Sequence, residues 1–562
     1  MAMGHASLRT TRRILAGAII LLSQNVLAVE SPESAADNRV GQSIYRDGRL
    51  ASGLPLRATA LKGVPLSGAD AACVKCHRRS GLGGSEGQNT IRPITGKLLF
   101  SQALPADDRW RAPPATIGAV ERPAYNQATL ARALREGIDP AGRTLDALMP
   151  RYTLSDADIA QLHAYLQALS SAPAPGVTDK EIHFATIVTP EVHPDRRHAM
   201  LEVLQAFFSD KNGGTRQEAR RRELPRKSMY RAYRTWVLHP WVLSGDPETW
   251  HRQLAERYRQ QPVFAVIGGT GDGSWQPVHA FCEAFELPCV FPDVDYPDVT
   301  ASGYYSLYFT RGVALEAEVL AKHLLESDQV RMIGTVVQVY RDDALGRVPA
   351  QVLHDLLQGK GGKAVIDYPL TGTSRLPADF LASLSRSERP YVLVIWLDAA
   401  SFHLLGLTDA PPAGLAAVYV SASLSALRRP DLPEPWLSRL RMVYPFELPT
   451  SRNQRLARTK AWLRTKNIPF THERTLANAF FAASITGEAM SHMGENFSRD
   501  YFIERIEQMT QTSVSPSIYP HLSLGPGQRF ASKGGYVVRF PPEEGGTPVA
   551  ISEWIVAPMS FE

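Results

Sequence analysis

Cysteine is scarce in this chain: only four of the 562 residues are cysteines. A fold held together by many disulfides is therefore excluded, as is a compact zinc site built from two close pairs of thiolates. Long apolar runs are lacking beyond the amino terminus, so no later stretch predicts a membrane-spanning helix. A strong excess of charge is also lacking, which gives no reason to expect a nucleic acid as a partner.

The amino terminus reads "RTTRRILAGAIILLSQNVLAVE", with a basic start, an apolar run over residues 14–22 and a small-residue exit ending at Ala28. This order is typical of a secretory signal peptide, so we expect residues 1–28 to be removed and the chain to reach the periplasm. An uncleaved anchor is the alternative, but the run is shorter than the roughly 20 apolar residues that span a bilayer. Without the arginines of this segment, 58 of the 61 basic residues remain against 56 acidic residues, so the mature chain is nearly neutral.

Two of the cysteines lie two residues apart in "AACVKCHRRSG", with His77 directly after the second. Three kinds of site contain such a pair: a covalent haem site, a zinc site and a thiol–disulfide redox pair. A zinc site needs further ligands, but Cys282 and Cys289 lie far along the chain. A redox pair follows a strand and opens a helix in a βαβ unit, and the preceding "LPLRATALKGVPLSGADA" shows no such pattern.

The spacing C-x-x-C-H is the attachment signature of c-type haem. In that reading, the thiols of Cys73 and Cys76 form thioethers with the haem vinyl groups, and His77 binds the iron. An electron carrier needs a sixth iron ligand, and Met149 is the one methionine between residues 28 and 173. We therefore expect one covalently attached haem c, with His77 and Met149 as the axial ligands.

This segment resembles a class I cytochrome c over about residues 36–170. The resemblance rests on an opening helix "NRVGQSIYRDG", the motif "CVKCH", and "MPRYTLSDADIAQLHAYL" as the methionine loop and closing helix. It implies an all-α domain in which the first helix, with Gly41 and Tyr45, packs across the last. His163 in the closing helix is interpreted as a packing or surface residue. An insert around residues 100–130 is longer than a minimal member needs, and no role is predicted for it.

Methionine–histidine ligation fills both axial positions of the iron, so it predicts outer-sphere electron transfer rather than catalysis. A dihaem peroxidase would need a second C-x-x-C-H motif, and the sequence has none. No nucleophile–base set supports an enzyme either. The expected partner is a periplasmic redox protein, either a dehydrogenase or another cytochrome.

A stretch rich in proline and small residues, "SSAPAPGVTDKE", follows and predicts a semi-stiff linker at residues 171–180. Over residues 181–562, strand-like runs such as "IHFATIVTP", "PVFAVIGG" and "YVLVIWLD" alternate with helical runs such as "PETWHRQLAERYRQ" and "RVPAQVLHDLLQ". This alternation predicts βαβ units and parallel sheets. The length exceeds one ordinary core, so we expect two α/β lobes.

The carboxyl-terminal part resembles the type 1 periplasmic binding protein fold of the branched-chain amino acid receptor group. The matching stretches are "VFAVIGGTGDGSWQPVHAFCEAFELPCVFP", "YYSLYFTRGVALEAEVLAKHLL" and "RMIGTVVQVYRDDALGRVPAQVLHDLL". The resemblance implies a small-molecule ligand in a cleft between two hinged lobes, as in the substrate-binding proteins of ABC transporters. The candidates for lining the cleft are Thr270, Ser274, Tyr340 and Trp396. A place in the core is the alternative for each of them, and for Trp396 above all.

Two further features each have two interpretations. Cys282 and Cys289 flank a helix-to-strand turn and form either a local disulfide or two buried free thiols. Arginines are dense from Arg216 to Arg234, which indicates a solvated face or a docking surface for an acidic partner.

The expected whole is a multidomain periplasmic protein, in which a monohaem cytochrome c domain precedes a domain that docks or senses a small molecule or a redox partner. The alternative is a solute-binding or sensor component in which the haem is regulatory.

Overall fold

The structure is a computed structural model. It describes residues 32–86, 89–101, 122–222, 234–297, 303–326, 333–361, 363–372, 374–377, 390–430, 432–510, 516–541 and 546–557, together with Asp379, Phe380 and Ser383. The segment expected as a signal peptide, most of the insert around residues 100–130 and half of the arginine-rich stretch lie outside the described residues. Within the described ranges, no helix is long and apolar enough to cross a membrane.

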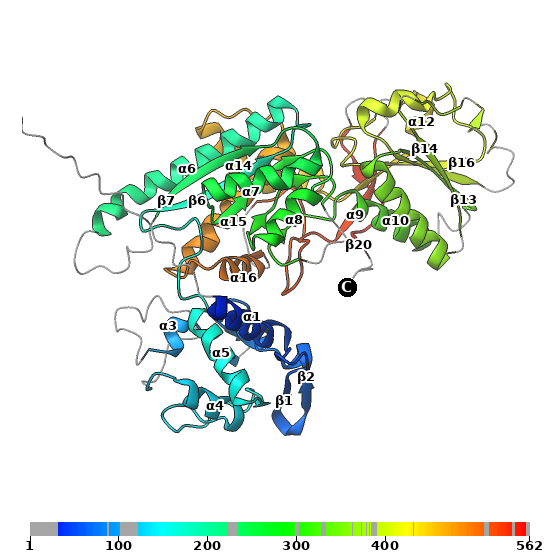
Figure 1. Cartoon of the computed structure of the whole chain (residues 1–562). Helices are drawn as coiled ribbons and strands as arrows, with labels where there is room; N and C mark the ends of the chain where they lie inside the picture. Colours follow the sequence, from blue (N-terminus) through cyan, green and yellow to red (C-terminus); the bar gives the residue numbers. More distant parts are fainter. Residues whose placement is uncertain are drawn as a thin grey trace, which may run out of the picture.

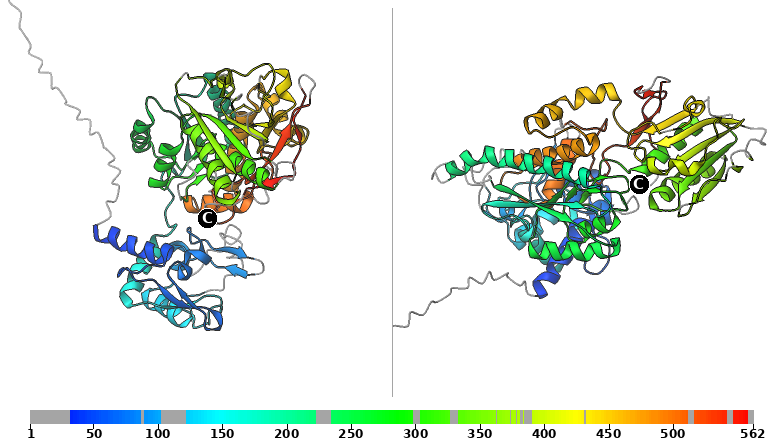
Figure 2. Two further views of the ribbon diagram at one scale, coloured as in Figure 1. Left: turned by 90° about the vertical axis from the view of Figure 1, so that its right-hand side faces the viewer. Right: turned by 90° about the horizontal axis from the view of Figure 1, so that it is seen from above.

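The amino-terminal domain is a small helical body that lies beneath the α/β part in Figure 1, and the side view of Figure 2 shows the same arrangement. Its elements are α1 (Pro32–Asp47), η1 (Leu61–Gly63), η2 (Gly68–Ala71), α2 (Val74–His77), α3 (Gly96–Leu99), α4 (Gln127–Glu136) and α5 (Asp156–Ala168), with the strands β1 (Arg57–Thr59), β2 (Pro65–Ser67), β3 (Gly84–Glu86), β4 (Asn89–Ile91) and β5 (Arg151–Thr153).

The first and last helices of this domain cross at Gly41. A Cβ atom at Gly41 would lie 2.3 Å from the carbonyl oxygen of Gln161 and 2.5 Å from Cβ of Tyr165, so only glycine allows this close approach. One turn along α1, the ring of Tyr45 packs 5.4 Å from the ring of Tyr165. The predicted packing of α1 across α5 is therefore confirmed.

The expectation of an all-α domain needs a correction, because two small antiparallel sheets accompany the helices. One has the order β2–β1–β5, and the other pairs β3 with β4. Gly48 ends α1 with a positive φ of 63°, and Pro65 in β2 lacks an amide hydrogen for a helix. The chain after α1 therefore turns into a hairpin instead of continuing as helix.

The first α/β unit is built on a parallel sheet of seven strands, with β7 beside β6 and the remaining order β11–β9–β6–β8–β10–β12. Its strands are β6 (Glu181–Val188), β7 (Thr235–Val242), β8 (Ala265–Ile267), β9 (Thr270–Gly271), β10 (Cys289–Val290), β11 (Asp293–Val294) and β12 (Ser306–Leu307). The helices between them are α6 (Pro194–Arg222), η6 (Pro247–Thr249), α7 (Trp250–Gln260) and α8 (Gln276–Ala284).

Alternating side chains of β6 explain why helices cover both faces of this sheet. Ile182, Phe184 and Val188 belong to one hydrophobic core, whereas Ala185 and Ile187 belong to another, which includes the buried faces of α7 and α8. The near-continuous apolar run of β6 is typical of a parallel strand that is buried on both sides.

The second α/β unit has an eight-stranded sheet of order β14–β13–β15–β16–β17–β18–β19, with β20 paired to β18. Strands β13 to β17 run parallel, and β18 is antiparallel to β17. The strands are β13 (Thr335–Arg341), β14 (Ala364–Leu370), β15 (Tyr391–Trp396), β16 (Leu415–Ser421), β17 (Leu440–Tyr444), β18 (Gly534–Arg539), β19 (Val549–Ala550) and β20 (Ile555–Val556). The helices are α9 (Val313–Glu326), α10 (Ala344–Gly361), η8 (Ala399–Leu405) and α12 (Glu434–Leu437).

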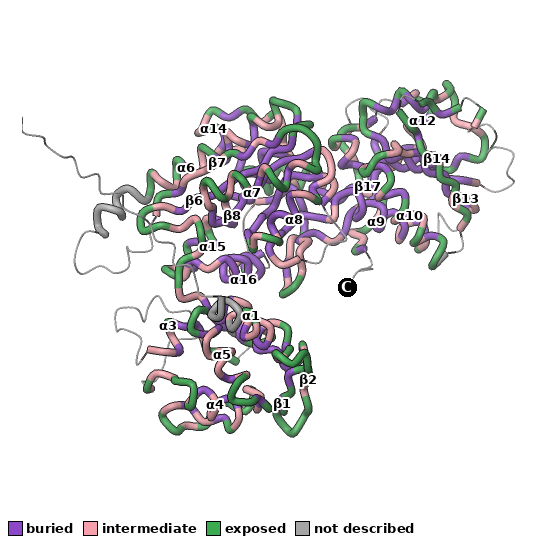
Figure 3. Tube along the Cα trace, in the orientation of Figure 1, coloured by how far each residue is buried: buried purple, intermediate pink, exposed green. Residues whose placement is uncertain are grey.

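The chain leaves the second unit after β17 and returns to the first before it completes the second sheet. The returning helices are α13 (Pro449–Arg455), α14 (Ala457–Thr465), α15 (Glu473–Met493) and α16 (Arg499–Thr510). Helix α15 packs on α6, and α16 packs on α15. Figure 1 shows α16 between the first α/β unit and α1 of the amino-terminal domain, and Figure 3 shows that it is buried there.

Candidate functional site

The C-x-x-C-H motif forms a single helical turn, α2. Cys73 precedes the turn and is buried, whereas Cys76 within it is exposed. Burial raises the pKa of the Cys73 thiol to about 12, so the group is a protonated thiol in this environment. Neither cysteine belongs to a disulfide in the structure.

His77 closes this turn with its ring inside the protein. Its Nδ1 lies 3.0 Å from the backbone carbonyl oxygen of Arg92. A carbonyl only accepts hydrogen bonds, so Nδ1 is the donor, and Nε2 of a neutral ring keeps a lone pair. Burial lowers the pKa of His77 to about 4, although the hydrogen bond to Arg92 acts in the opposite direction. This low pKa keeps the ring neutral. A neutral imidazole oriented in this way is suited to binding a metal through Nε2.

Gly83 allows the carbonyl of Arg92 to reach His77. Its φ is +66°, and a Cβ atom there would lie 2.1 Å from the carbonyl oxygen of Ile91. The backbone amide of Gly83 also donates to the carbonyl of His77 over 3.2 Å. The loop after the motif thus folds back tightly onto the histidine.

The methionine loop approaches the same turn. Met149 is half-buried and packs against the core of the amino-terminal domain, two residues before β5. Tyr152 on β5 lies in the same hydrophobic core as Cys73, and its hydroxyl interacts with the Cys73 thiol. The structure therefore brings the strand after Met149 into contact with the cysteine motif, although the two segments are far apart in the sequence. His163 packs edge-on against Phe100 at 4.8 Å and takes no part in this arrangement.

These observations agree with the comparison to protein families, in which the cytochrome c family model matches residues 63–170. This segment is a cytochrome c domain. Such a domain holds haem c, and the buried neutral imidazole beside two thiols fits that group.

The α/β part is similar in fold to solved substrate-binding proteins. One is a fatty acid ABC transporter substrate-binding protein from Thermomonospora curvata, with 14% identity, a TM-score of 0.47, and coverage of 69% of this chain and 95% of that chain. Another is a branched chain amino acid ABC transporter protein from Thermus thermophilus with bound valine, with 12% identity, a TM-score of 0.47, and coverage of 68% and 98%. A putative branched-chain amino acid ABC transporter protein from Rhodospirillum rubrum has 14% identity, a TM-score of 0.46, and coverage of 67% and 100%. The comparison with curated proteins gives no match.

The predicted cleft residues of the first α/β unit lie near each other at the end of its sheet. Thr270 opens β9 and is buried, and its hydroxyl accepts a hydrogen bond from Nη2 of Arg196 at 2.7 Å. Ser274 is half-buried in the turn before α8, where its hydroxyl accepts from the amide of Gln276 at 3.3 Å.

The predicted cleft residues of the second unit are neighbours on adjacent parallel strands. Tyr340 on β13 pairs in register with Trp396 on β15. Trp396 is buried in the core of this unit, and its indole nitrogen donates to Oε1 of Gln338 at 2.8 Å. Tyr340 is half-buried, and burial raises its pKa.

Sequence reasoning missed an ion-pair cluster at the edge of the first sheet. Buried Asp293 on β11 lies 2.8 Å from Nε of Arg474 on α15 and 3.6 Å from Nη2 of Arg196 on α6. Although burial opposes it, these two guanidinium groups hold the pKa of Asp293 below its usual range. Arg196 also pairs with Asp272 after β9. Arg196, Asp293 and Arg474 lie far apart in the sequence, so no local pattern could have found the cluster.

A pocket of about 210 Å³ lies where β13, β14 and β15 end. Parallel α/β sheets bind ligands at the carboxyl ends of their strands, and this pocket has that position. Its lining residues are Arg341, Gly372, Arg375, Ser401, His403 and Leu404. Arg341 donates to the carbonyl of Gly372. Two guanidinium groups and an imidazole make the pocket basic.

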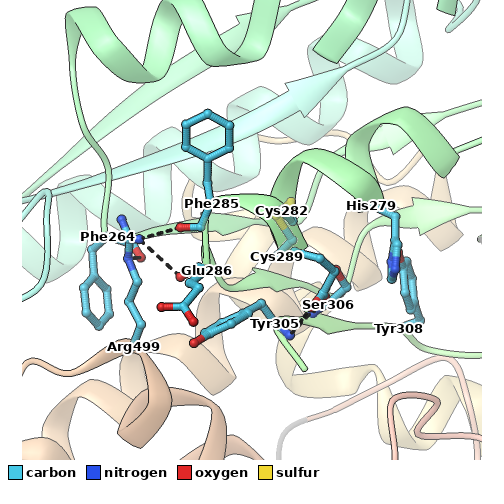
Figure 4. Close-up of a disulfide and its surroundings, with 11 residues drawn as sticks. Phe264, His279, Cys282, Phe285, Glu286, Cys289, Tyr305, Ser306, Tyr308 and Arg499 are labelled. Carbon is cyan, nitrogen blue, oxygen red and sulfur yellow. Dashed lines mark hydrogen bonds between the residues drawn. A yellow bond between two sulfur atoms is a disulfide. The ribbon is translucent and has the colours of Figure 1, made fainter. Parts of the chain in front are cut away.

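Of the two interpretations of Cys282 and Cys289, the structure shows the disulfide (Figure 4). It ties the end of α8 to β10 and thereby closes the loop that contains Glu286. Arg499 of α16 donates to the backbone carbonyl of Glu286 over 3.2 Å, and the Glu286 carboxylate pairs with Arg46 of α1 at 3.1 Å. The cross-linked loop therefore contacts both α16 and the cytochrome c domain.

Proposed function

We propose that this protein is an exported monohaem cytochrome that transfers single electrons, joined to an α/β part that binds a small molecule or a redox partner. Cys73 and Cys76 would attach the haem covalently, and His77 and Met149 would bind its iron. The observation that carries the proposal is the buried neutral imidazole of His77, which the Arg92 carbonyl orients beside the two thiols.

Haem c, when bound, supplies a one-electron ferric–ferrous couple. The hydrogen bond from His77 to Arg92 holds the ring in one orientation and increases the basicity of Nε2. The uncharged thioether of Met149 favours the ferrous state. If His77 and Met149 both bind the iron, they would leave no position there for oxygen or peroxide, so we propose a carrier rather than a catalyst.

Exposed apolar side chains support docking of a redox partner on the cytochrome c domain. Leu61 and Val64 lie at the β1–β2 hairpin, Leu148 immediately precedes Met149, and the three are 48%, 52% and 52% exposed. Strand β1 pairs with β5, which follows Met149, so these residues lie around one small sheet. We propose that another periplasmic cytochrome or a dehydrogenase docks there.

Export through a signal peptide at residues 1–28 remains part of the proposal, and the disulfide between Cys282 and Cys289 supports an oxidising compartment. The proposed domains are residues 36–170 and 181–562, joined by a linker at 171–180. In the two-lobed proposal, the α/β units are hinged lobes, and Ser274 and Tyr340 line the cleft between them. Thr270 and Trp396, predicted to line it as well, are buried inside their units instead.

Substitution of the axial residues tests the haem site. Met149→Ala keeps both thiols, so the haem stays attached, but the weak long-wavelength absorption band of a methionine–iron bond disappears and the reduction potential falls. His163→Ala is the matched control, because His163 packs against Phe100 within the same domain. If Met149→Ala leaves the visible spectrum of the oxidised protein unchanged, Met149 is not a ligand.

A second candidate function, a solute sensor in which the haem is regulatory, is favoured by the basic pocket of the second unit. Arg341, Arg375 and His403 suit a small carboxylate or phosphate, because charge-assisted hydrogen bonds to guanidinium are strong. Inorganic phosphate or succinate should then raise the melting temperature, with stabilisation of about 2.7 kcal/mol at a hundred times the dissociation constant. The shift should vanish in Arg341→Ala and persist in Arg347→Ala, whose guanidinium pairs with Asp342 outside the pocket lining. The absence of a shift in the unsubstituted protein argues against a small anionic solute.

A further inference from the structure

The segment directly after the haem motif docks onto α16 of the first α/β unit. Arg79 stacks on the ring of Tyr304 at 4.0 Å and lies 3.7 Å from Asp500 of α16. Ser80 is buried and bonds to Glu504, one turn further along α16. Leu82 belongs to the large core of the α/β part rather than to the core of the cytochrome c domain.

The contact between residues 79–82 and α16 is called the seam. Glu504 lies at its centre and is 4% exposed. Its Oε1 accepts from the backbone amide of Ser80 at 2.9 Å, and its Oε2 lies 2.6 Å from the Ser80 hydroxyl. The hydroxyl also accepts from the amide of Leu82 at 3.1 Å. A hydroxyl donates or accepts, so the contact with Oε2 is a hydrogen bond whether Glu504 is ionised or protonated. The site therefore accommodates both states without rearrangement of the backbone.

The neighbouring acids of α16 are paired, but Glu504 is not. Asp500 binds Arg46 at 2.9 Å, and Glu507 binds Arg529 at 2.7 Å. Glu504 forms no ion pair with any residue that the structure describes. Charged and titratable groups of four segments surround it. They are Tyr45 of α1, Arg78 and Arg79 after the motif, Tyr304 before β12, and Asp500, Tyr501, Arg505 and Glu507 of α16.

Burial raises the pKa of Glu504 to about 8, and the negative charge of Asp500 acts in the same direction. The hydrogen bonds from Ser80 and the charge of Arg78 oppose this shift. Effects that raise and effects that lower the pKa therefore act on this carboxyl group together. One additional charge nearby changes its protonation, because screening by water is weak at a buried site.

We propose that Glu504 is a proton-binding site linked to the oxidation state of the cytochrome c domain. When a one-electron donor protein reduces the ferric haem to ferrous, the added negative charge favours uptake of one proton from solvent onto the Glu504 carboxylate. When the ferrous haem passes the electron to an acceptor, the proton returns to solvent. The inference rests on the proposed haem at Cys73, Cys76 and His77, and Ser80 lies three positions after His77.

The pH dependence of the reduction potential tests this link. In the unsubstituted protein the potential should fall as pH rises through the titration range of Glu504, by at most 59 mV per pH unit, the value of a tenfold change in a one-electron couple. Glu504→Gln should flatten the curve there. The matched control is Glu316→Gln, because Glu316 is likewise buried and raised in pKa to about 7, but accepts from the amides of Ala422 and Ser423 in the second unit.

The haem propionates contribute the same slope of potential against pH to all three proteins. The difference in slope between Glu504→Gln and the other two therefore measures the contribution of Glu504. Redox-difference infrared spectroscopy gives a second readout: a band of a protonated carboxyl group should grow on reduction and be missing in Glu504→Gln. Ser80→Ala provides another variant if Glu504→Gln does not mature, and it should move the sloping region to higher pH, because the carboxylate loses a hydrogen bond.

Equal slopes in the unsubstituted protein and Glu504→Gln, with no carboxyl band lost, would overturn the inference while leaving the proposed electron carrier intact. A protein that binds no haem would instead contradict the proposed function itself.

Discussion

At the scale of single residues, the account depends on a few buried polar groups whose partners fix their state. His77 is neutral because its ring is buried, and it is oriented because the Arg92 carbonyl accepts from its Nδ1. Asp293 stays ionised because Arg196 and Arg474 lie beside it. Burial raises the pKa of Glu504, which has hydrogen bonds but no ion-pair partner among the described residues to offset that effect.

The raised pKa of Glu504 predicts how the unfolding free energy depends on pH. Between the ordinary value of 4.5 and about 8, the folded protein holds a proton that the unfolded chain has released. This contribution to stability is complete below the unfolded pKa and is lost as pH rises through the folded pKa, by at most ~1.4 kcal/mol per pH unit. Glu504→Gln does not ionise, so its melting temperature should fall less between about pH 5 and pH 8 than that of the unsubstituted protein. Thermal unfolding followed by circular dichroism across this pH range checks the prediction. Parallel curves of melting temperature against pH for the two proteins would contradict it.

A second residue-scale prediction concerns the two thiols. Cys73→Ser and Cys76→Ser each remove one of the two proposed thioethers, so each variant should retain haem through a single bond and mature in lower yield. Cys73→Ser should lose more, because its thiol also contacts Tyr152 in the buried core. Haem staining after denaturing electrophoresis measures the covalent fraction. Full covalent attachment in both variants would show that other residues hold the haem.

At the scale of elements, the crossing of α1 and α5 is the close contact on which the cytochrome c domain is built. Gly41→Ala places a methyl group 2.3 Å from the carbonyl oxygen of Gln161, so the helices must separate. We expect a loss of about 2 kcal/mol in the free energy of unfolding, as for other overpacked cores. Chemical denaturation followed by haem absorbance measures it.

Gly213→Ala is the matched control for this substitution. Gly213 lies within α6, and nothing is within 4 Å of the position that its Cβ would take. The exchange should be neutral or stabilise by up to about 1 kcal/mol, because alanine favours a helix over glycine. An equal effect of both exchanges would mean that the α1–α5 crossing is not tightly packed.

Local sequence patterns predicted most of the helices and strands, because the apolar periodicity of such an element depends only on residues that are neighbours in the sequence. "YVLVIWLD" became β15 and "RVPAQVLHDLLQ" became part of α10, since their apolar periods match a buried strand and an amphipathic helix. The short strands β1 and β2 were not expected, because three-residue strands have no period to detect.

Local patterns could not predict the seam around Glu504 or the ion-pair cluster around Asp293, because both form only when distant segments pack together. "SRDYFIERIEQM" contains acids one turn apart, which in isolation is typical of a solvated helix face. Only docking of the segment after His77 buries Glu504, and this contact joins residues separated by more than four hundred positions. The cysteine motif was readable in advance, since its chemistry lies within five consecutive residues.

At the scale of the whole molecule, the cytochrome c domain is fixed to the α/β part by more than its linker. Arg46 of α1 pairs with Asp500 of α16 at 2.9 Å and with Glu286 at 3.1 Å. Figure 3 shows the buried α16 directly above α1. Because Leu82 also enters the core of the α/β part, the turn of the cysteine motif and the first α/β unit should move as one body.

Arg46→Ala should loosen this attachment. The exchange leaves the carboxylate of Asp500 with Arg79 at 3.7 Å and the Tyr305 hydroxyl at 2.7 Å, and we expect a loss of about 2 kcal/mol in docking free energy. Faster proteolysis within residues 171–180 and a larger radius of gyration in solution scattering would report the separation.

The control for this experiment is Arg135→Ala, which breaks an ion pair with exposed Asp156 and two hydrogen bonds to the Leu154 carbonyl inside the same domain. Exposed pairs contribute little, so neither proteolysis nor scattering should change. Unaltered proteolysis in both variants would mean that the ion pairs of Arg46 do not hold the two parts together.

The central claim is that Cys73 and Cys76 hold one haem on the exported chain. Intact mass spectrometry of protein secreted by cells able to mature c-type cytochromes tests this most directly. The account predicts the mass of a chain beginning after Ala28 plus one haem, which acidic solvent extraction does not remove, and a colourless chain without that added mass in the double variant Cys73→Ser, Cys76→Ser. A colourless unsubstituted protein, or a haem that acid extracts freely, would contradict it.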